Sequence, residues 1–199
     1  LALASLEKSD LKTDELKKAY QKIAFYRGVE LFNNLDYPLS ISLFDKSLTY
    51  GTYDQLIKAR ALFWKGEALY RIEKYQEAVA SYTSFNNTSA AYTLPEYDLI
   101  EYNIGYAYFH QKKFGNAIES FRKFVDAATQ EQSREKGDAL NSTGDCYYSQ
   151  TDYYSATDFY GRAIANNIGN VEYAMLQKGI CQGLTNKDIQ KIQTLQDLV

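Results

Sequence analysis

Several residue types are scarce in this chain of 199 residues, and each scarcity excludes a class of protein. Lys and Arg number 22 against 25 for Asp and Glu, so the chain lacks the surplus of cations that nucleic-acid binding needs. No apolar run approaches the ~20 residues that a membrane-spanning helix requires. We therefore expect no nucleic-acid partner and no membrane insertion by this segment.

Proline, cysteine and histidine are also rare, with two, two and one residues respectively. So few prolines allow long helices almost everywhere, and two cysteines do not make a disulfide framework. The single histidine, His110, has no second group to complete a metal site or a nucleophilic hydrolase site. We predict no catalytic residue, no metal ligand and no cofactor, and hence no enzyme.

What the chain does contain is a repeat marked by five glycines: Gly28, Gly66, Gly105, Gly144 and Gly179. The spacings between them are 38, 39, 39 and 35 residues. Around each glycine, apolar residues recur at steps of three and four in two segments, which is typical of helices. A short polar connection separates the two segments. Each unit is therefore predicted to be a helical hairpin.

This pattern resembles the tetratricopeptide repeat, a helical hairpin of about 34 residues. When the five glycines are placed at position 8 of that repeat, a small residue falls at position 20 in the first four units: Ser40, Ala78, Ala117 and Ala156. A large residue falls at position 24: Phe44, Tyr82, Phe121 and Tyr160, with Leu195 in the fifth unit. The resemblance implies an all-α fold, a right-handed superhelical solenoid. Proline is absent from position 32, where the family usually has it.

The resemblance covers nearly the whole chain, and we expect one solenoid domain over residues 1–199. Residues 1–8 would be the tail of a preceding repeat, followed by five repeats at residues 13–50, 52–88, 93–127, 129–167 and 170–199. Capping boxes are predicted at three repeat starts: Thr52 with Gln55, Thr93 with Glu96, and Thr129 with Gln132.

Neither terminus carries the polar capping helix that solenoids normally have. We therefore expect a segment excised from a longer, bacterial-type repeat protein. Apolar residues at Leu1 to Leu6 and at Leu195 to Val199 would then be exposed, and we expect them to allow end-to-end self-association.

Positions 5, 9 and 12 of each first helix share one side of that helix, because they are four and three residues apart. In the tetratricopeptide family this side lines the concave groove, and we call it the groove face. The residues predicted to line it are Phe25, Phe32, Phe63, Glu67, Tyr70, Tyr102, Tyr106, Phe109 and Tyr148. Arg60, Arg71 and Asn103 would act with Glu67 to orient a partner.

A row of exposed aromatic rings on a concave wall marks a binding surface. The predicted function is therefore a non-enzymatic scaffold that binds a partner protein or peptide, with Phe63, Tyr70, Tyr102, Tyr106 and Phe109 as anchors. Two alternatives stay open. The rings could pack on one another in a structural spacer or self-association segment that takes no peptide, or they could stack on a carbohydrate.

Chaperone-binding members of the family hold a C-terminal carboxylate with a clamp of Lys, Asn and Arg. Asn103 occupies one possible clamp position here. The fourth unit, however, has Asp138 and Ser142 where that clamp needs cations. We therefore predict that the clamp is absent.

The two cysteines, Cys146 and Cys181, both occupy position 10 of their units. Packed helices stand about 8–10 Å apart, which exceeds the ~7 Å limit between Cα atoms for a disulfide. We expect two buried free thiols.

Overall fold

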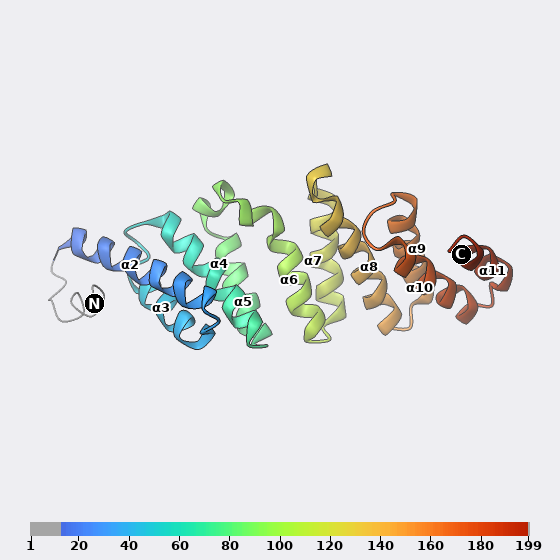
Figure 1. Ribbon diagram of the computed structural model, residues 1–199, viewed down its shortest axis with the longest axis horizontal. Helices are drawn as coiled ribbons and strands as arrows, with labels where there is room; N and C mark the ends of the chain where they lie inside the picture. The colour runs from blue at the N-terminus through green and yellow to red at the C-terminus, as the bar shows by residue number, and fades with distance from the viewer. Residues whose placement is uncertain (1–12, 199) are drawn as a thin grey trace. The chain divides into compact units, whose positions relative to one another are not determined.

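The computed structural model describes residues 13–198, and these form α-helices and 3₁₀-helices without a β-strand (Figure 1). The α-helices are α2 (Asp14–Asn33), α3 (Tyr37–Thr49), α4 (Gln55–Arg71), α5 (Tyr75–Asn86), α6 (Ile100–His110), α7 (Phe114–Ala127), α8 (Ser133–Ser149), α9 (Tyr153–Ala165), α10 (Val171–Leu184) and α11 (Asp188–Gln196). Three 3₁₀-helices lie between hairpins: η1 (Ser89–Thr93), η2 (Pro95–Leu99) and η3 (Gln130–Gln132). The predicted all-α fold of helical hairpins is confirmed.

The chain divides into two compact units, the first ending at Ile100 and the second beginning at Glu101. The first unit holds the hairpins α2–α3 and α4–α5, and the second holds α6–α7, α8–α9 and α10–α11. Each pair of α-helices falls inside one of the five predicted repeats. The expectations for residues 1–8 and for Val199 lie outside the described residues.

The five repeating glycines are explained by the side chain at position 24, which crosses over them. A Cβ atom on Gly66 would lie 2.5 Å from the ring of Tyr82, and one on Gly144 would lie 2.5 Å from the ring of Tyr160. The same close approach occurs at Gly28 with Phe44, at Gly105 with Phe121 and at Gly179 with Leu195. Because an interior packs to the density of a crystal, no side chain fits in these places. Leu195 therefore packs inside the last hairpin.

The two helices of every hairpin are joined by the same tight turn of three residues. Its middle residue, at position 15, has a positive φ in each case: Leu35 (63°), Glu73 (61°), Lys112 (57°), Thr151 (62°) and Asn186 (57°). The next N–H bonds a carbonyl five residues earlier, as from Asp36 to Leu31 and from Asp152 to Tyr147, both at 2.9 Å. This is the Schellman arrangement, and it fixes where each first helix ends.

Two of the three predicted capping boxes are wrong. Thr52 does not cap α4, because the neighbouring Asp54 does so instead and its carboxylate accepts from the Ile57 N–H at 3.1 Å. Thr93 and Glu96 fall in two separate 3₁₀-helices, η1 and η2.

Proline explains the second of these errors. Pro95 forces the preceding residue, Leu94, into an extended conformation (φ −103°, ψ 137°). That residue separates η1 from η2, and α6 begins only at Ile100. The third predicted box is confirmed, since the Thr129 N–H donates to Oε1 of Gln132 at 2.9 Å at the start of η3.

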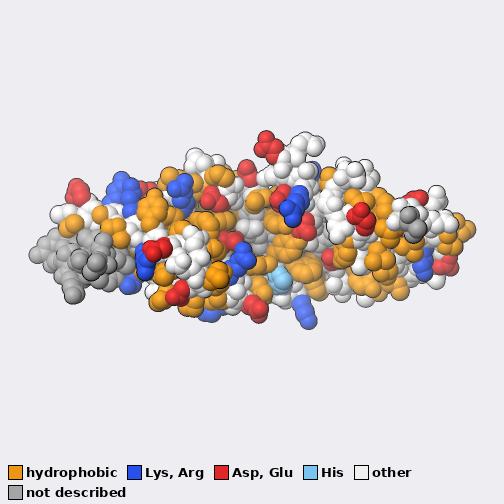
Figure 2. Space-filling view, viewed as in Figure 1, with side chains coloured by type: hydrophobic (Ala, Val, Ile, Leu, Met, Phe, Trp, Pro, Cys, Tyr) orange, Lys and Arg blue, Asp and Glu red, His pale blue; other side chains and the backbone are white. Residues whose placement is uncertain are grey.

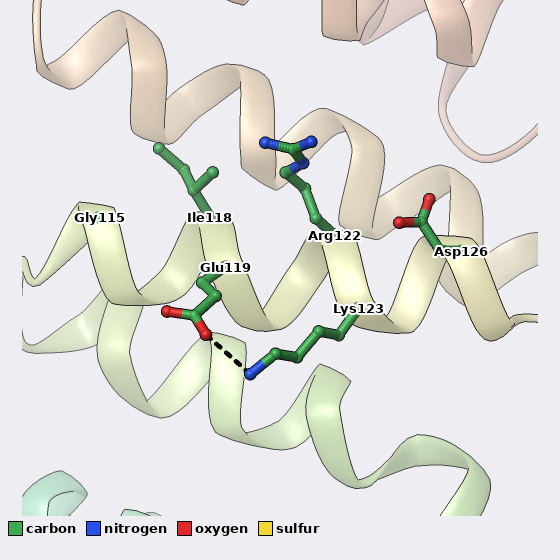
Figure 3. Close-up of a pocket in the computed structure, with 6 residues that line it drawn as sticks. All are labelled: Gly115, Ile118, Glu119, Arg122, Lys123 and Asp126. Atoms are coloured by element: carbon green, nitrogen blue, oxygen red, sulfur yellow. Dashed lines mark ion pairs between the residues drawn. The ribbon is translucent and has the colours of Figure 1, made fainter.

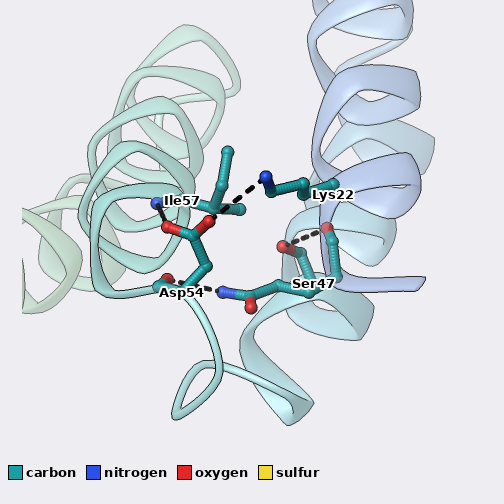
Figure 4. A network of polar contacts seen from close by, with 5 residues as sticks. Lys22, Ser47, Asp54 and Ile57 are labelled. Atoms are coloured by element: carbon teal, nitrogen blue, oxygen red, sulfur yellow. Dashed lines mark hydrogen bonds and ion pairs between the residues drawn. The ribbon is translucent and has the colours of Figure 1, made fainter. Parts of the chain in front are cut away.

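Buried amides connect the first helices of neighbouring hairpins within each unit. In the first unit, Nε2 of Gln21 donates to the backbone carbonyl of Asp54 at 2.8 Å, while Oγ of Ser47 donates to the Gln21 carbonyl at 2.8 Å (Figure 4). In the second unit, Nδ2 of Asn141 donates to the carbonyl of Asn170, the N-cap of α10, at 3.1 Å. An amide on one first helix thus fixes the N-terminus of the next.

Candidate partner-binding faces

The two position-5 phenylalanines of the predicted groove face belong to the core. Phe25 is 3% exposed and packs against Ile57 and Ala61 of α4, the first helix of the next hairpin. Phe63 is 8% exposed, and its ring lies 5.6 Å from that of Phe85 in the same hairpin. The predicted exposure of Phe25 on the groove face and of Phe63 as an anchor is therefore wrong, because neighbouring helices cover both rings.

Position 12 carries a partly exposed ring in four hairpins, and each ring packs on the first ring of the following helix. The pairs are Phe32–Tyr37 (5.3 Å), Tyr70–Tyr75 (5.3 Å), Phe109–Phe114 (5.9 Å) and Tyr148–Tyr153 (5.4 Å). Each pair is T-shaped or tilted, which is the geometry that aromatic rings prefer. The pairs hold the position-12 rings in fixed orientations while leaving part of their surface accessible.

Trp64 is a member of the first unit's face that the sequence reasoning missed. Its ring lies 5.0 Å from Phe32 and 5.7 Å from Phe63, and it is partly exposed. Trp64 occupies position 6, which was not counted with positions 5, 9 and 12. Including position 6 in the predicted groove face would have identified it.

The polar residues expected to orient a partner in the first unit are Glu67, Arg60 and Arg71. The carboxylate of Glu67 accepts from the Tyr82 hydroxyl at 2.7 Å. Burial raises the pKa of Glu67, while the Tyr82 hydrogen bond and the charge of Arg71 oppose that rise. Arg60 is partly exposed and Arg71 is exposed. Burial also raises the pKa of Tyr70, to about 12.

In the second unit, tyrosine hydroxyls of α6 meet a carboxylate of α8. The hydroxyl of Tyr102 donates to Oδ2 of Asp138 at 2.7 Å, and the hydroxyl of Tyr106 donates to the same oxygen. The hydroxyls of Tyr106 and Ser142 also lie 2.8 Å apart. Two predicted groove residues, Tyr102 and Tyr106, thus contact Asp138 and Ser142, which stand where the carboxylate clamp would need cations.

A second carboxylate of α8, Asp145, binds hydroxyls of the next two helices. It accepts from Tyr160 of α9 at 2.6 Å and from Tyr173 of α10 at 2.7 Å. Burial raises the pKa of Asp145, the two hydroxyl hydrogen bonds oppose the rise, and the charge of Asp138 adds to it. Asp138, Ser142 and Asp145 are spaced by four and three residues, so one face of α8 presents them together.

The remaining predicted residues of the second unit lie on the same two first helices. Asn103 and Phe109 are partly exposed on α6, and Tyr148 is partly exposed on α8. His110, the pale blue side chain in Figure 2, is exposed beside Tyr106, with ring centroids 6.5 Å apart.

A hollow of about 380 Å³ lies along α7 (Figure 3). It is lined by Gly115, Ile118, Glu119, Arg122, Lys123 and Asp126. Nζ of Lys123 lies 2.8 Å from Oε1 of Glu119, so that cation is already paired. All the lining residues belong to one helix, and we assign the hollow no ligand.

Within residues 13–198, no three or more His, Cys, Asp or Glu side chains are grouped so as to hold a metal ion. None of the helices in this range combines the length and apolar character needed to cross a membrane. Cys146 and Cys181 are buried free thiols, as predicted. Burial raises their pKa values to about 12 and about 11.

Comparison with solved structures shows proteins of similar fold. MamA from Desulfovibrio magneticus RS-1 is 13% identical with a TM-score of 0.69, over 89% of this chain and 92% of that chain. The apo form of RapI is 12% identical with a TM-score of 0.73, over 98% and 56%. A Rap protein complexed with Competence and Sporulation Factor is 19% identical with a TM-score of 0.54, over 96% and 55%.

Two family models, each described as a tetratricopeptide repeat, match the sequence at residues 27–91 and 102–131. A search of curated proteins gives no significant match. At the identities found, the solved structures establish the fold alone, while the family models recognise the repeat itself. The chain therefore contains tetratricopeptide repeats within residues 27–91 and 102–131.

Proposed function

We propose that this chain is a non-enzymatic scaffold that binds a partner protein or peptide along the groove faces of its two units. The observation that carries the proposal is the set of position-12 rings, which are held by their ring pairs and remain partly exposed. Rings that are already ordered lose little conformational entropy when a partner binds, so their contact area contributes more to affinity. Tetratricopeptide-type folds generally serve as such scaffolds, and stacked repeats offer extended binding surfaces.

The structure changes which residues are suited to act as anchors. Phe25 and Phe63 of the first unit are buried, whereas the second unit's groove face has four partly exposed rings: Tyr102, Tyr106, Phe109 and Tyr148. Tyrosine and phenylalanine supply large contact areas with few rotatable bonds, and such residues dominate binding energies at interfaces.

The charges on the two faces favour different partner groups. In the second unit, positions 2, 5, 6, 9, 12 and 13 of the first helices hold Asp138 and Asp145 but no Lys or Arg. The corresponding positions of the first unit include Arg60 and Arg71 beside Glu67. Because aromatic faces and carboxylates both attract cations, we infer that the second unit favours a segment bearing Lys or Arg.

One of the similar proteins supports a bound partner by analogy, since that Rap protein was solved in complex with Competence and Sporulation Factor. The burial of Phe25 and Phe63 favours the second candidate function, a structural segment whose aromatic residues only pack on neighbouring helices. The two functions differ in whether the accessible rings contact another molecule.

Affinity capture with a matched control tests this difference. The chain would be immobilised beside a Phe109→Ala/Tyr148→Ala variant and a Tyr92→Ala/Tyr154→Ala control, which removes two exposed rings outside the groove face. All three must show the same helical circular dichroism. We expect a protein that the chain and the control retain, and that the groove variant binds at least about tenfold more weakly. Equal retention by all three would favour the structural segment.

A further inference from the structure

Neighbouring first helices meet through the same repeat positions in both units. Position 5 of α2, Phe25, packs on Ile57 and Ala61, which are positions −1 and 3 of α4, and Trp64 at position 6 joins the same cluster. In the second unit, Asn141 at position 5 of α8 bonds the carbonyl at position −1 of α10. An apolar position 5 thus faces apolar positions of the next helix, and a polar one faces polar groups.

The last hairpin exposes apolar side chains at the positions that receive a next helix. Leu176 at position 5 of α10 is 45% exposed and Ile180 at position 9 is 37% exposed. At position 5 of the first hairpin, Phe25 is 3% exposed because α4 covers it. The apolar face of α10 therefore matches the kind that accepts a first helix with apolar residues at positions −1, 3 and 6.

This chain contains such a helix in α2. Its positions −1, 3 and 6 are Ala19, Ile23 and Tyr26, where α4 has Ile57, Ala61 and Trp64. Tyr26 is 58% exposed, and Ala19 and Ile23 are partly exposed.

The other first helices carry polar residues at two of the three positions. These residues are Glu96 and Asn103 around α6, Glu135 and Ser142 in α8, and Asn170 and Gln177 around α10. Positions −1 and 3 hold Ile57 and Ala61 in α4 but Ala19 and Ile23 in α2, so the same two residue types are exchanged. Such exchanges preserve packed volume.

We propose that α10 of one copy of this chain receives α2 of a second copy, in the way that α2 receives α4 within the first unit. The two faces are different patches, so the contact is head-to-tail and association is not limited to two copies. Leu195 packs within its own hairpin, against Gly179, so we assign the self-association expected of that leucine to Leu176 and Ile180 instead.

Sedimentation velocity on the full chain tests the contact, from about 1 to about 200 µM to span weak and moderate affinities. We expect species larger than a dimer at the high end of this range. Leu176→Lys and Tyr26→Lys each place a charge on one of the two faces, at exposed sites that tolerate lysine. Leu39→Lys, at a residue 56% exposed on α3, is the matched control and should associate like the unchanged chain.

Mixing the variants distinguishes head-to-tail association from other modes. Each face variant alone should remain monomeric, whereas a 1:1 mixture should form a heterodimer, because α10 of the Tyr26→Lys chain still receives α2 of the Leu176→Lys chain. Circular dichroism confirms that both are folded, and Ile180→Lys replaces Leu176→Lys if that variant loses helix. An unchanged chain that stays monomeric over the whole range would overturn the proposal. Association of the Tyr26→Lys variant by itself would also overturn it, since that requires α10 to pair with α10.

Discussion

Position 15 of each repeat lies in the left-handed region of backbone space without being glycine. Non-glycine residues there are strained because Cβ approaches the backbone, and a β-branched residue such as Thr151 (φ 62°) is the least suited of the five. The turn nevertheless forms, since its hydrogen bonds satisfy carbonyls at the end of the first helix. The hydrogen bonds of the turn offset the backbone strain and fix the end of the first helix.

Replacing Thr151 with glycine should therefore stabilise the protein. We expect Thr151→Gly to raise the free energy of unfolding by up to about 1 kcal/mol, because the Cβ strain outweighs the entropy of an added glycine at this conformation. Urea denaturation followed by circular dichroism measures the change. Thr151→Ala keeps a Cβ atom and serves as control, and a glycine variant no more stable than the alanine variant would contradict the argument.

Some residue-scale features could be predicted from the sequence and others could not. The position-8 glycines were identified by their spacing alone. The positive φ at position 15 could not be predicted, because Leu35, Glu73 and Thr151 have unrelated side chains and none of them is glycine. Likewise, repeat register placed Phe63 and Tyr102 in one class, although the first is core and the second is partly exposed. Burial depends on what lies across from a residue, which register does not specify.

At the scale of the helix, tertiary packing and local competition decide where each element begins. Thr52 and Gln55 match a capping box, yet α4 begins at Gln55, so the residue at its N-cap is Asp54. Pro95 likewise moves the start of α6 to Ile100. The sequence therefore predicts that each helix exists more reliably than it predicts its first residue.

The carboxylate that joins α8, α9 and α10 makes these helices sensitive to pH. Because folding raises the pKa of Asp145, the folded state holds its proton more tightly than the unfolded chain does. The contribution of this group to stability is therefore greatest below the unfolded pKa, and it is lost as pH rises through the folded pKa. Deprotonated Asp145 therefore stabilises the fold less than protonated Asp145 does.

Asp145→Asn removes this charge while keeping an oxygen that can accept from Tyr160 and Tyr173. We expect the variant to gain stability relative to the unchanged chain between pH 4 and pH 7, with the difference growing as pH increases. Thermal denaturation at a series of pH values measures it. Asp158→Asn, an exposed residue of α9, provides the control. A stability difference independent of pH would refute the assignment.

At the scale of the whole molecule, the chain consists of two units that each have their own internal contacts. In repeat proteins, stability is approximately the sum of the individual repeats and their nearest-neighbour interfaces. A destabilising substitution should therefore lower the stability of the hairpin that contains it and of the hairpins packed against it more than that of distant hairpins. Distant repeats should retain their protection against hydrogen exchange.

Gly144→Ala tests this expectation in the second unit. The added Cβ would meet the ring of Tyr160 at 2.5 Å, and overpacking of this kind costs about 1–3 kcal/mol. Hydrogen exchange followed by mass spectrometry should show faster exchange in α8, α9 and α10 but unchanged exchange in α2 and α3. Gly115→Ala, where an added Cβ would meet nothing within 4 Å, is the control. Uniformly faster exchange along the chain would indicate a single cooperative unit instead.

The turns inside the hairpins all have the same length, which restricts where residues can be inserted into this chain. Three residues join the two helices in every hairpin, from Asn34–Asp36 to Thr185–Lys187, and each turn is held by the same pair of hydrogen bonds. Three of the four connections between hairpins, at residues 50–54, 128–132 and 166–170, are equally short, whereas the fourth, at residues 87–99, is longer and holds η1 and η2. We therefore expect an added segment to be accommodated in a connection between hairpins, as at residues 87–99, and not in the turn inside a hairpin.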